Sequence, residues 1–425
     1  MKLSSVSALQ LFNIIRFGTT VLISILLAKS DLSTTEISIY EAFLFFANMA
    51  SFFWISGGQS ALLQYFPNLD SDSKKKTLFN VWLFFLFASI IAGVCLFLFQ
   101  NTLLGLAKFE TPPPFDLLCL FLMFNTPAWL TPIFYLLSGK NKQILTYGII
   151  SFSLQIIVVM LPIWFGFTLR ETFLGLVILG VGKFIWSLLL VAKFGDLKTD
   201  FTLLKTYLIL AFPLILHVLI GSSVEYVDGL IVTSHFEDGT FAIFRYGAKE
   251  LPLTLLLIGA IVMALIPQVS EDLKSGLQQI KIETQKLSKW LFPLSAFLIL
   301  VSPYLFPLVF NPEFAESAEV FNIYLLIISS RILLPQVVLI AHKKNYFLVL
   351  SAIIETVLNI SLSLILVKNY GLVGIAFATV IAYLINKLIL IYFNWKILKI
   401  APNRYIDFGS WLIYNSLLFG TFLIF

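Results

Sequence analysis

The uncharged stretches of this chain decide its fold, and the clearest of them, Thr77–Ala107, reads TLFNVWLFFLFASIIAGVCLFLFQNTLLGLA without one Asp, Glu, Lys or Arg. A helix needs about 20 apolar residues to cross the hydrocarbon core of a bilayer. Lipid offers the backbone no hydrogen-bond partners, and the stretch lacks the alternation of a lipid-facing barrel strand. It therefore predicts a membrane-spanning α-helix.

Similar stretches recur along the whole chain. Runs with no charge, or with one or two charges inside them, occupy about 6–28, 42–69, 77–107, 117–139, 143–169, 172–192, 206–224, 251–270, 290–312, 317–341, 345–367, 369–386 and 408–425. We therefore expect an all-α polytopic membrane protein with 12 core transmembrane helices and a 13th helix at the C-terminus.

The composition leads to the same class. Of the 425 residues, 59% are hydrophobic and only 12% are charged, where a soluble domain carries roughly 25% charged residues. A soluble domain of this length could not cover such a composition with polar surface, which excludes a cytosolic enzyme, a nucleic-acid-binding protein and a disordered chain. The sequence has no P-loop, no His/Cys metal spacing and no catalytic triad. We expect no enzyme, no cofactor and no metal other than a coupling ion.

Basic residues indicate the orientation in the membrane. If the N-terminus is cytoplasmic, the loops predicted inside carry 18 Lys and Arg residues, the loops predicted outside carry 4, and the other 6 of the 28 lie within spans. An excess of this kind on short inner loops is the positive-inside pattern. It predicts a multi-pass protein with a cytoplasmic N-terminus.

The spans fall into two sets of six. Ile39-Tyr40-Glu41 in the first set corresponds to Ile243-Phe244-Arg245 in the second, and the sixth and twelfth spans both open with Gly-Leu-Val, at Gly175 and Gly371. These similarities favour a parallel repeat, a common transporter plan. The predicted organisation is a six-helix lobe (1–192), a cytoplasmic linker (193–205), a second six-helix lobe (206–395), and a cytoplasmic segment with the extra helix (396–425).

Basic residues within spans point to an anionic cargo. Charge is costly in lipid and marks functional positions, and arginine offers a planar, permanently charged fork for phosphate oxygens. The residues expected to bind substrate in a cationic cavity are Arg16, Arg245, Lys249, Lys183, Arg331 and Glu41. Internal ion pairs are the alternative explanation for them. The sixth intramembrane base, Lys387, is expected to extend to the inner interface.

Acidic and polar residues on three other spans suggest ion coupling. Glu225 and Asp228 are three apart, Glu355 and Asn359 are four apart, and Thr379 lies on the next span. Oxygen ligands from neighbouring helices can hold Na⁺, and a buried carboxylate can instead exchange H⁺. The alternative is that the carboxylates neutralise Arg331 or face an outer vestibule. In the same region, Pro213 is expected to kink its helix and to act in gating.

Three longer stretches carry a resemblance to a known family. They are YLILAFPLILHVLIGSSVEYVDGLIVT (Tyr207–Thr233), AIFRYGAKELPLTLLLIGAIVMALIPQVSE (Ala242–Glu271) and GLVGIAFATVIAYLINKLILIY (Gly371–Tyr392). The chain resembles, over about residues 5–395, the oligosaccharide flippases that translocate O-antigen and capsular units. Their superfamily includes the lipid II flippases and the multidrug and toxin extrusion transporters.

The resemblance implies roles for several of these residues. Lipid II flippases line their cavity with arginines on spans 1 and 8, the helices that carry Arg16 and Arg245 here. Some of them have a sodium site built from spans 7, 11 and 12, which carry Asp228, Asn359 and Thr379. The match is incomplete, because Glu355 stands where a shorter side chain would be expected.

The expected function follows from the resemblance and the intramembrane charges together. The chain is expected to flip an undecaprenyl-pyrophosphate-linked oligosaccharide across the bacterial inner membrane by alternating access through a cationic cavity, with Na⁺ or H⁺ coupling. Its partners would be that glycan, membrane lipids, and the polymerase and glycosyltransferases of the same pathway. We expect a monomer that binds no nucleic acid.

Two alternatives stay open. A cation-coupled multidrug exporter of the same superfamily would need an acidic cavity for organic cations, whereas the first span carries Arg16 and no acid. A membrane polysaccharide polymerase or glycosyltransferase would need a large outer loop with catalytic side chains, and the predicted outer loops are short.

The C-terminal span gives the first testable prediction. A reporter fused after Phe425 should be periplasmic, because a 13th span places the C-terminus outside. Activity of fused alkaline phosphatase and fluorescence of fused green fluorescent protein measure this. A fusion after Lys205, in a predicted inner loop, is the cytoplasmic control. A cytoplasmic reporter after Phe425 would leave 12 spans.

Overall fold

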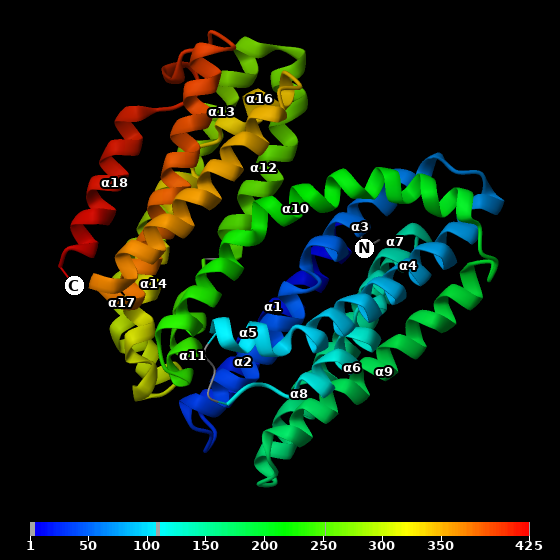
Figure 1. Cartoon of the computed structure of the whole chain (residues 1–425). Coiled ribbons are helices and arrows are strands. Elements are labelled where there is room, and N and C mark those ends of the chain that lie inside the picture. Colours follow the sequence, from blue (N-terminus) through cyan, green and yellow to red (C-terminus); the bar gives the residue numbers. More distant parts are fainter. Residues whose placement is uncertain (1–4, 108–110, 251, 425) are drawn as a thin grey trace. The chain divides into compact units, whose positions relative to one another are not determined.

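The computed structural model describes residues 5–107, 111–250 and 252–424, apart from a few side chains. Every regular element in this part of the chain is a helix (Figure 1). By its internal contacts the chain divides into two compact units. The first comprises Met1–Ser222 with Glu237–Gly239, and the second comprises Ser223–Phe236 with Thr240–Phe425.

The first unit is built from helices in the first half of the chain. They are α1 (Ser5–Ala28), α2 (Thr34–Met49), α3 (Phe52–Tyr65), η1 (Phe66–Asn68), α4 (Ser71–Leu98), α5 (Gln100–Ala107), α6 (Phe115–Asn125), η2 (Pro127–Leu130), α7 (Thr131–Leu137), α8 (Asn141–Trp164) and α9 (Leu169–Phe194). The helix α10 (Phe201–His235) contributes its first part to this unit and its last part to the second.

The second unit holds the remaining helices. They are α11 (Asp238–Gly247), α12 (Pro252–Glu271), α13 (Leu273–Val309), η3 (Pro312–Phe314), α14 (Ala315–Leu325), α15 (Ile328–Arg331), α16 (Pro335–Ala341), α17 (Tyr346–Lys396), η4 (Pro402–Arg404) and α18 (Phe408–Phe422).

Aromatic side chains form the core of the first unit and keep their polar tips paired. Trp82, Phe85 and Tyr207 are buried in one cluster. The indole of Trp82 donates to Ser187 Oγ (2.9 Å), and the hydroxyl of Tyr207 donates to the carbonyl of Gly58 (2.9 Å). Because buried polar groups without partners are costly, these bonds allow large aromatic rings to fill the space between helices.

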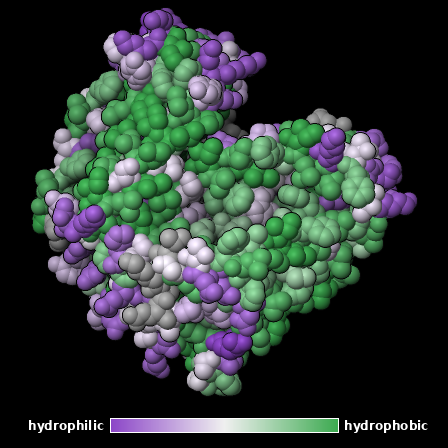
Figure 2. Space-filling view, viewed as in Figure 1, coloured by the Kyte–Doolittle hydropathy of each residue, from purple (hydrophilic) through white to green (hydrophobic). Residues whose placement is uncertain are grey.

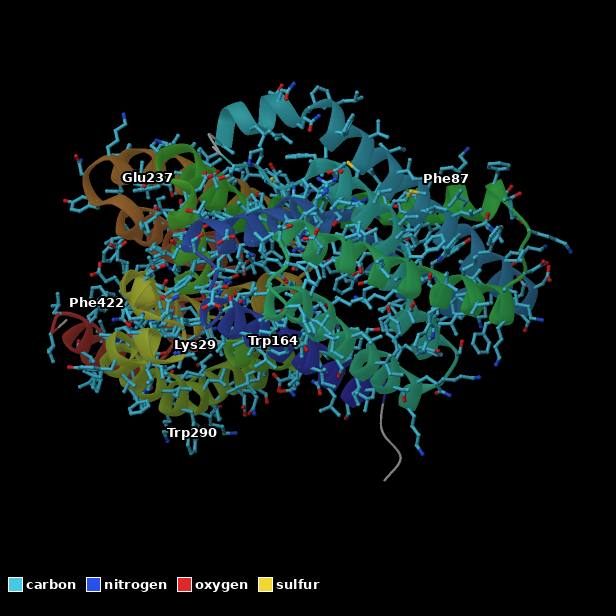
Figure 3. All side chains as sticks on the ribbon, turned by 90° about the horizontal axis from the view of Figure 1, so that it is seen from below. Lys29, Phe87, Trp164, Glu237, Trp290 and Phe422 are labelled. Atoms are coloured by element: carbon cyan, nitrogen blue, oxygen red, sulfur yellow. The ribbon has the colours of Figure 1, made fainter. Side chains whose placement is uncertain are left out.

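The outer surface is apolar, as expected of a protein dissolved in lipid. Hydrophobic side chains cover much of the visible face, and hydrophilic ones gather mostly near helix ends (Figure 2). The side chains of Trp290 (80% exposed), Trp164 (67%) and Phe87 (59%) project outward (Figure 3). Within the residues that the structure describes, eight helices are long and apolar enough to cross a membrane, or up to 10 if each bent helix pair is one span. The chain is therefore an all-helical, multi-pass membrane protein.

Two predicted spans lie within one helix. The runs at 345–367 and 369–386 both belong to α17, which covers 51 residues and is interrupted at Gly371 (φ 57°, ψ −138°). The C-terminal run forms α18, which at 15 residues is shorter than a typical span. The sequence predicted 12 core spans and a 13th, which is more than the number of helices long enough to span. One reason is that α17 contains two predicted spans and counts as a single helix.

The predicted linker at 193–205 is fastened to the first unit. The buried amide of Asn80 donates to the carbonyl of Lys198 (3.1 Å) and accepts from the backbone N–H of Asp200 (2.9 Å). The N–H of Asp196 donates to the carbonyl of Lys75 (3.1 Å). The division between the two compact units falls further along, at Ser222 within α10.

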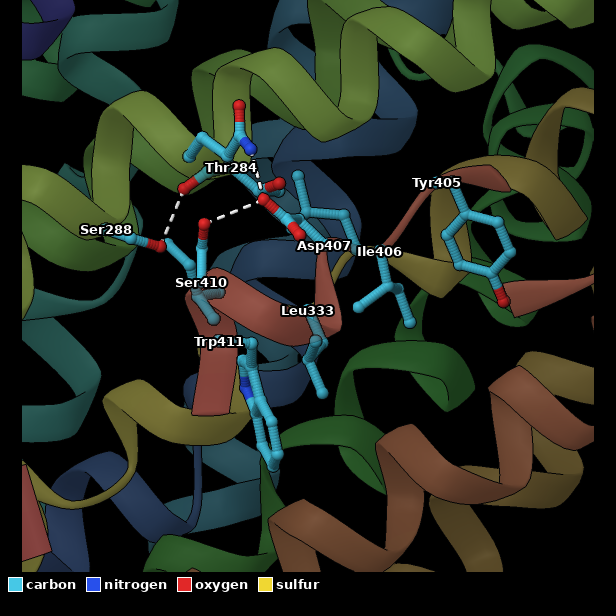
Figure 4. A pocket seen from close by; sticks show the side chains of 11 residues that line it. Thr284, Ser288, Leu333, Tyr405, Ile406, Asp407, Ser410 and Trp411 are labelled. Atoms are coloured by element: carbon cyan, nitrogen blue, oxygen red, sulfur yellow. Dashed lines mark hydrogen bonds between the residues drawn. The ribbon is translucent and has the colours of Figure 1, made fainter. Parts of the chain in front are cut away.

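The C-terminal helix α18 packs on α13 through a polar contact at its start (Figure 4). The Asp407 carboxylate accepts hydrogen bonds from Ser410 Oγ (2.7 Å) and from the amide of Gln285. These two bonds hold the pKa of the Asp407 carboxyl below its ordinary value. The indole of Trp411 donates to the carbonyl of Ser329 (2.9 Å). The adjoining cavity, about 20 Å³, has room for one water molecule.

The break in α17 gives the second prediction. The backbone angles at Gly371 are accessible to glycine almost alone, so Gly371→Ala should destabilise the protein by about 1–3 kcal/mol. Thermal unfolding of the purified protein in detergent measures the change. Gly420→Ala in α18, where an added Cβ meets nothing within 4 Å, is the control and should leave the unfolding temperature unchanged or slightly higher. Equal effects of both substitutions would contradict this assignment.

Candidate functional site

Arg16 of α1 is exposed although it lies within an apolar helix of the first unit. Its guanidinium carbon lies 5.1 Å from the centre of the Trp129 ring, a cation–π distance. Among the residues that the structure describes, the guanidinium has no hydrogen-bond or ion-pair partner. Its N–H donors are therefore exposed and have no partner among the described residues.

Trp129 is presented by a break in its helix. It lies in η2, which follows α6 and begins at Pro127, a residue that cannot donate the next helical hydrogen bond. Gln59 of α3 donates its amide N–H to the carbonyl of Trp129 (2.7 Å). At the end of α6, Asn125 accepts a long hydrogen bond from Lys183 of α9 (3.5 Å). Arg16 and Lys183 thus both reach this one broken segment of the first unit.

Glu41, the one acid in the set expected to bind substrate, is buried in α2, with 7% of its surface exposed. Pro213, expected to act in gating, lies inside α10 and is exposed.

Arg331 of the second unit has an internal anion. Its Nε and Nη2 donate to the two carboxylate oxygens of Glu250 (3.0 and 2.6 Å), and its guanidinium lies 4.3 Å from the centre of the Tyr383 ring. Charge and N–H donors are both matched within the protein, which is the internal ion-pair explanation considered above. Glu355, which is 9% exposed, lies within electrostatic range of Arg331.

Lys387 donates to the side-chain oxygen of Gln336 (3.0 Å) and acts electrostatically on Glu355. It therefore has a polar partner within the second unit, and its extension to the inner interface stays a prediction. Its neighbourhood contains two acids and two bases.

Arg245 and Lys249 do not share one continuous helix, although their four-residue spacing predicted that they would. The helix α11 ends at Gly247, and Lys249 lies beyond it with its ammonium 4.8 Å from the centre of the Tyr246 ring. A side chain at Gly247 would meet the carbonyl of Ser317 at 2.4 Å, so only glycine allows this close approach. The four-residue spacing therefore does not place the two cations on one helix face.

Asp228 of α10 is the centre of a buried polar network in the second unit. Its carboxylate, 1% exposed, accepts hydrogen bonds from the hydroxyls of Thr379 (2.5 Å), Tyr324 (3.4 Å) and Ser363 (3.4 Å). Asn359 donates to Thr379 Oγ1 (3.0 Å). The structure thus brings together Asp228, Asn359 and Thr379. Glu355 lies one turn before Asn359, and the side chain of Glu225 lies outside the described residues.

This network is chemically suited to a hard cation or a proton. The side-chain oxygen of Asn359 is buried and has no hydrogen-bond partner among the described residues. Together with the Asp228 carboxylate and three hydroxyl oxygens, it offers the oxygen ligands that alkali and alkaline-earth cations prefer. In the described part of the chain there is no group of three or more His, Cys, Asp or Glu side chains that could hold a metal ion.

At the Arg16 and Asp228 sites, Trp129, Tyr324 and Ser363 were not singled out from the sequence as site residues. Ser363 follows Asn359 by four residues, as Asn359 follows Glu355, so the spacing along the helix carried a signal. Trp129 and Tyr324 carried none, because aromatic residues are frequent throughout the chain.

The fold and these sites are those of one class of protein, the multi-pass helical transporters with charged sites inside their spans. The family model described as lipid II flippase MurJ matches residues 59–423, and the chain belongs to this family. It is therefore a transporter and not an enzyme, as expected, and a polymerase or glycosyltransferase is excluded. A search of curated proteins finds no match.

Solved structures with the same fold come from the same superfamily. A lipid II flippase MurJ in an inward closed conformation has a TM-score of 0.72 at 19% identity, over 97% of this chain and 92% of that one. An inward-facing MATE transporter of the MOP superfamily has a TM-score of 0.67 at 12% identity, over 95% and 94%. A variant of the Vibrio cholerae MATE transporter VcmN has a TM-score of 0.53 at 14% identity, over 99% and 98%. The superfamily expected from the sequence is confirmed.

Proposed function

We propose that this protein flips a polyprenyl-pyrophosphate-linked glycan across the bacterial inner membrane. Membership of the lipid II flippase family supports a lipid-linked precursor as the cargo. The observation that carries the proposal is Arg16, an exposed intramembrane guanidinium without an internal anion among the described residues. A charge in this setting is costly unless a ligand meets it, and a pyrophosphate is the ligand whose geometry fits arginine.

The proposed mechanism lowers the cost of moving a polar head through about 30 Å of hydrocarbon. The polyprenyl tail stays in lipid while the pyrophosphate is held by cations on the first, sixth and eighth spans: Arg16, Lys183, Arg245 and Lys249. Alternating access between two six-helix lobes, with a bend at Pro213, then exposes the head to the other side. This proposal includes 12 core spans, a cytoplasmic N-terminus and a monomeric protein.

Arg331 takes a different place in the proposal. Its fork is occupied by Glu250, so we assign it to the internal charge balance of the second unit, with Glu355 and Lys387. Removal of one partner from such a buried pair is expected to destabilise the protein.

The glycan is proposed to be that of lipid II, because the matching family model is that of lipid II flippases. An O-antigen or capsular repeat unit, expected from the sequence, has the same pyrophosphate linkage and differs in the group that this linkage carries. Complementation separates the two: a lipid II flippase restores growth of cells depleted of their own, whereas a repeat-unit flippase restores only surface polysaccharide.

Multidrug export is the second candidate function, since MATE transporters share the fold. It would require an acidic and apolar binding surface for organic cations. The first span presents Arg16 instead, which favours an anionic cargo.

The third prediction tests the cationic site. Arg16→Ala combined with Arg245→Ala should abolish complementation in cells that depend on this protein, because the pyrophosphate loses both charged forks. Growth and surface glycan are measured at matched protein levels in the membrane. Arg170→Ala, which removes an exposed arginine paired with Asp116, is the control and should complement fully. Normal function of the double variant would contradict the cationic mechanism.

The fourth prediction tests ion coupling. If Asp228 and Glu355 bind the coupling ion, Asp228→Asn and Glu355→Ala should each remove the dependence of transport on a sodium or proton gradient. A neutral side chain can neither balance the charge of Na⁺ nor bind and release a proton in this exchange. Flipping is followed in proteoliposomes with imposed Na⁺ or pH gradients. Asp116→Asn, at an exposed ion pair, serves as the control. Transport by both variants with unchanged ion dependence would show that the coupling site lies elsewhere.

A further inference from the structure

Arg16 and Arg331 both lie over aromatic rings, and among the described residues an internal anion is seen for Arg331 and not for Arg16. Arg331 lies over Tyr383 (4.3 Å) and directs Nε and Nη2 at the Glu250 carboxylate. Arg16 lies over Trp129 (5.1 Å), and its guanidinium has no hydrogen-bond or ion-pair partner within the described residues. The two sites differ in the source of the anion: Glu250 of the protein at Arg331, and no described residue at Arg16.

A cation–π contact limits where the guanidinium can lie. A guanidinium over an aromatic face can use its flat side for this contact and keep the N–H donors of its edge for an anion. At Arg331 the carboxylate is met by this in-plane edge. A phosphate group can take the same two-pronged contact, because arginine pairs with carboxylate and phosphate in the same geometry.

Gln59 fixes the backbone of Trp129. The helix that carries Trp129 is broken at η2, and Gln59 donates to the Trp129 carbonyl across 2.7 Å. Gln59 belongs to α3 and Trp129 to a segment 70 positions further along the chain, so the bond joins separate helices. This bond fixes the backbone at the break.

We propose that Trp129 and Gln59 are positioning residues that hold the Arg16 guanidinium edge-on toward a diphosphate or phosphate group of the substrate head. The inference rests on the proposed function, because it takes Arg16 to be a substrate contact. Trp129 provides the ring over which the guanidinium lies, and Gln59 fixes the backbone that carries this ring. Lysine is a poorer substitute at position 16, since an ammonium keeps the charge but has no planar fork.

The test measures the binding of farnesyl diphosphate to the purified full chain in detergent by isothermal titration calorimetry. Arg16→Ala should weaken binding at least about tenfold. Trp129→Leu should weaken it about tenfold and Trp129→Phe about threefold, following the strength of the cation–π contact. Gln59→Leu should weaken it about threefold. Arg16→Lys should bind more weakly than the unchanged protein and more tightly than Arg16→Ala, because it keeps the charge without the fork.

A double-mutant cycle separates positioning from a general structural effect. Trp129→Leu with Arg16→Ala should bind no more weakly than Arg16→Ala alone, because the ring acts only through the guanidinium. Trp164→Leu, at an exposed tryptophan of the same unit, should bind normally. If Trp129→Leu fails to fold, the graded loss in Trp129→Phe and in Gln59→Leu decides the question.

The outcomes distinguish this inference from the proposed function. Unchanged binding in Arg16→Ala overturns the cationic site itself. Weakened binding in Arg16→Ala, with normal binding in Trp129→Leu or with additive losses in the double variant, overturns the positioning role and leaves the proposed function standing.

Discussion

The cost of an unmatched polar group in hydrocarbon is the constraint on which this structure depends. Every backbone N–H and carbonyl must find a partner, so all regular elements in the described chain are helices. The same cost applies to side chains, and it explains why buried tryptophan and tyrosine tips in the first unit are paired with a hydroxyl and a carbonyl. Where charges do enter the spans, each therefore needs a physical reason.

The two units meet that cost in different ways. The second unit matches its charges internally: Arg331 with Glu250, Lys387 with Gln336, and Asp228 with three hydroxyl donors. In the first unit, Arg16 lies on an indole, and its polar edge has no described protein partner. The cation that carries the proposed function is therefore one whose anion the first unit does not supply within the described residues.

The breaks in the helices contribute as much to the placement of the site residues as the helices do. Pro127 and the short η2 bring Trp129 to Arg16, Gly247 ends α11 before Lys249, and Gly371 separates the two parts of α17. At each break the chain gives up regular hydrogen bonds and gains a side-chain position that a continuous helix would not offer. Gln59 and its bond to the Trp129 carbonyl show how a neighbouring helix restores a lost partner.

Sequence alone determined the helical class and the membrane setting, because these depend on the length and polarity of runs such as Thr77–Ala107, which are local properties. It indicated the superfamily through the resemblance of longer stretches such as Tyr207–Thr233. It also identified Asp228, Asn359 and Thr379 as related residues, since helical spacing and family resemblance carry that information. Only the tertiary structure decided which cation has an internal anion. Arg16 and Arg331 look alike in sequence, each a lone arginine in an apolar run, and they differ because Glu250 reaches only Arg331. That difference depends on contacts between residues far apart in the chain, for which no local pattern exists.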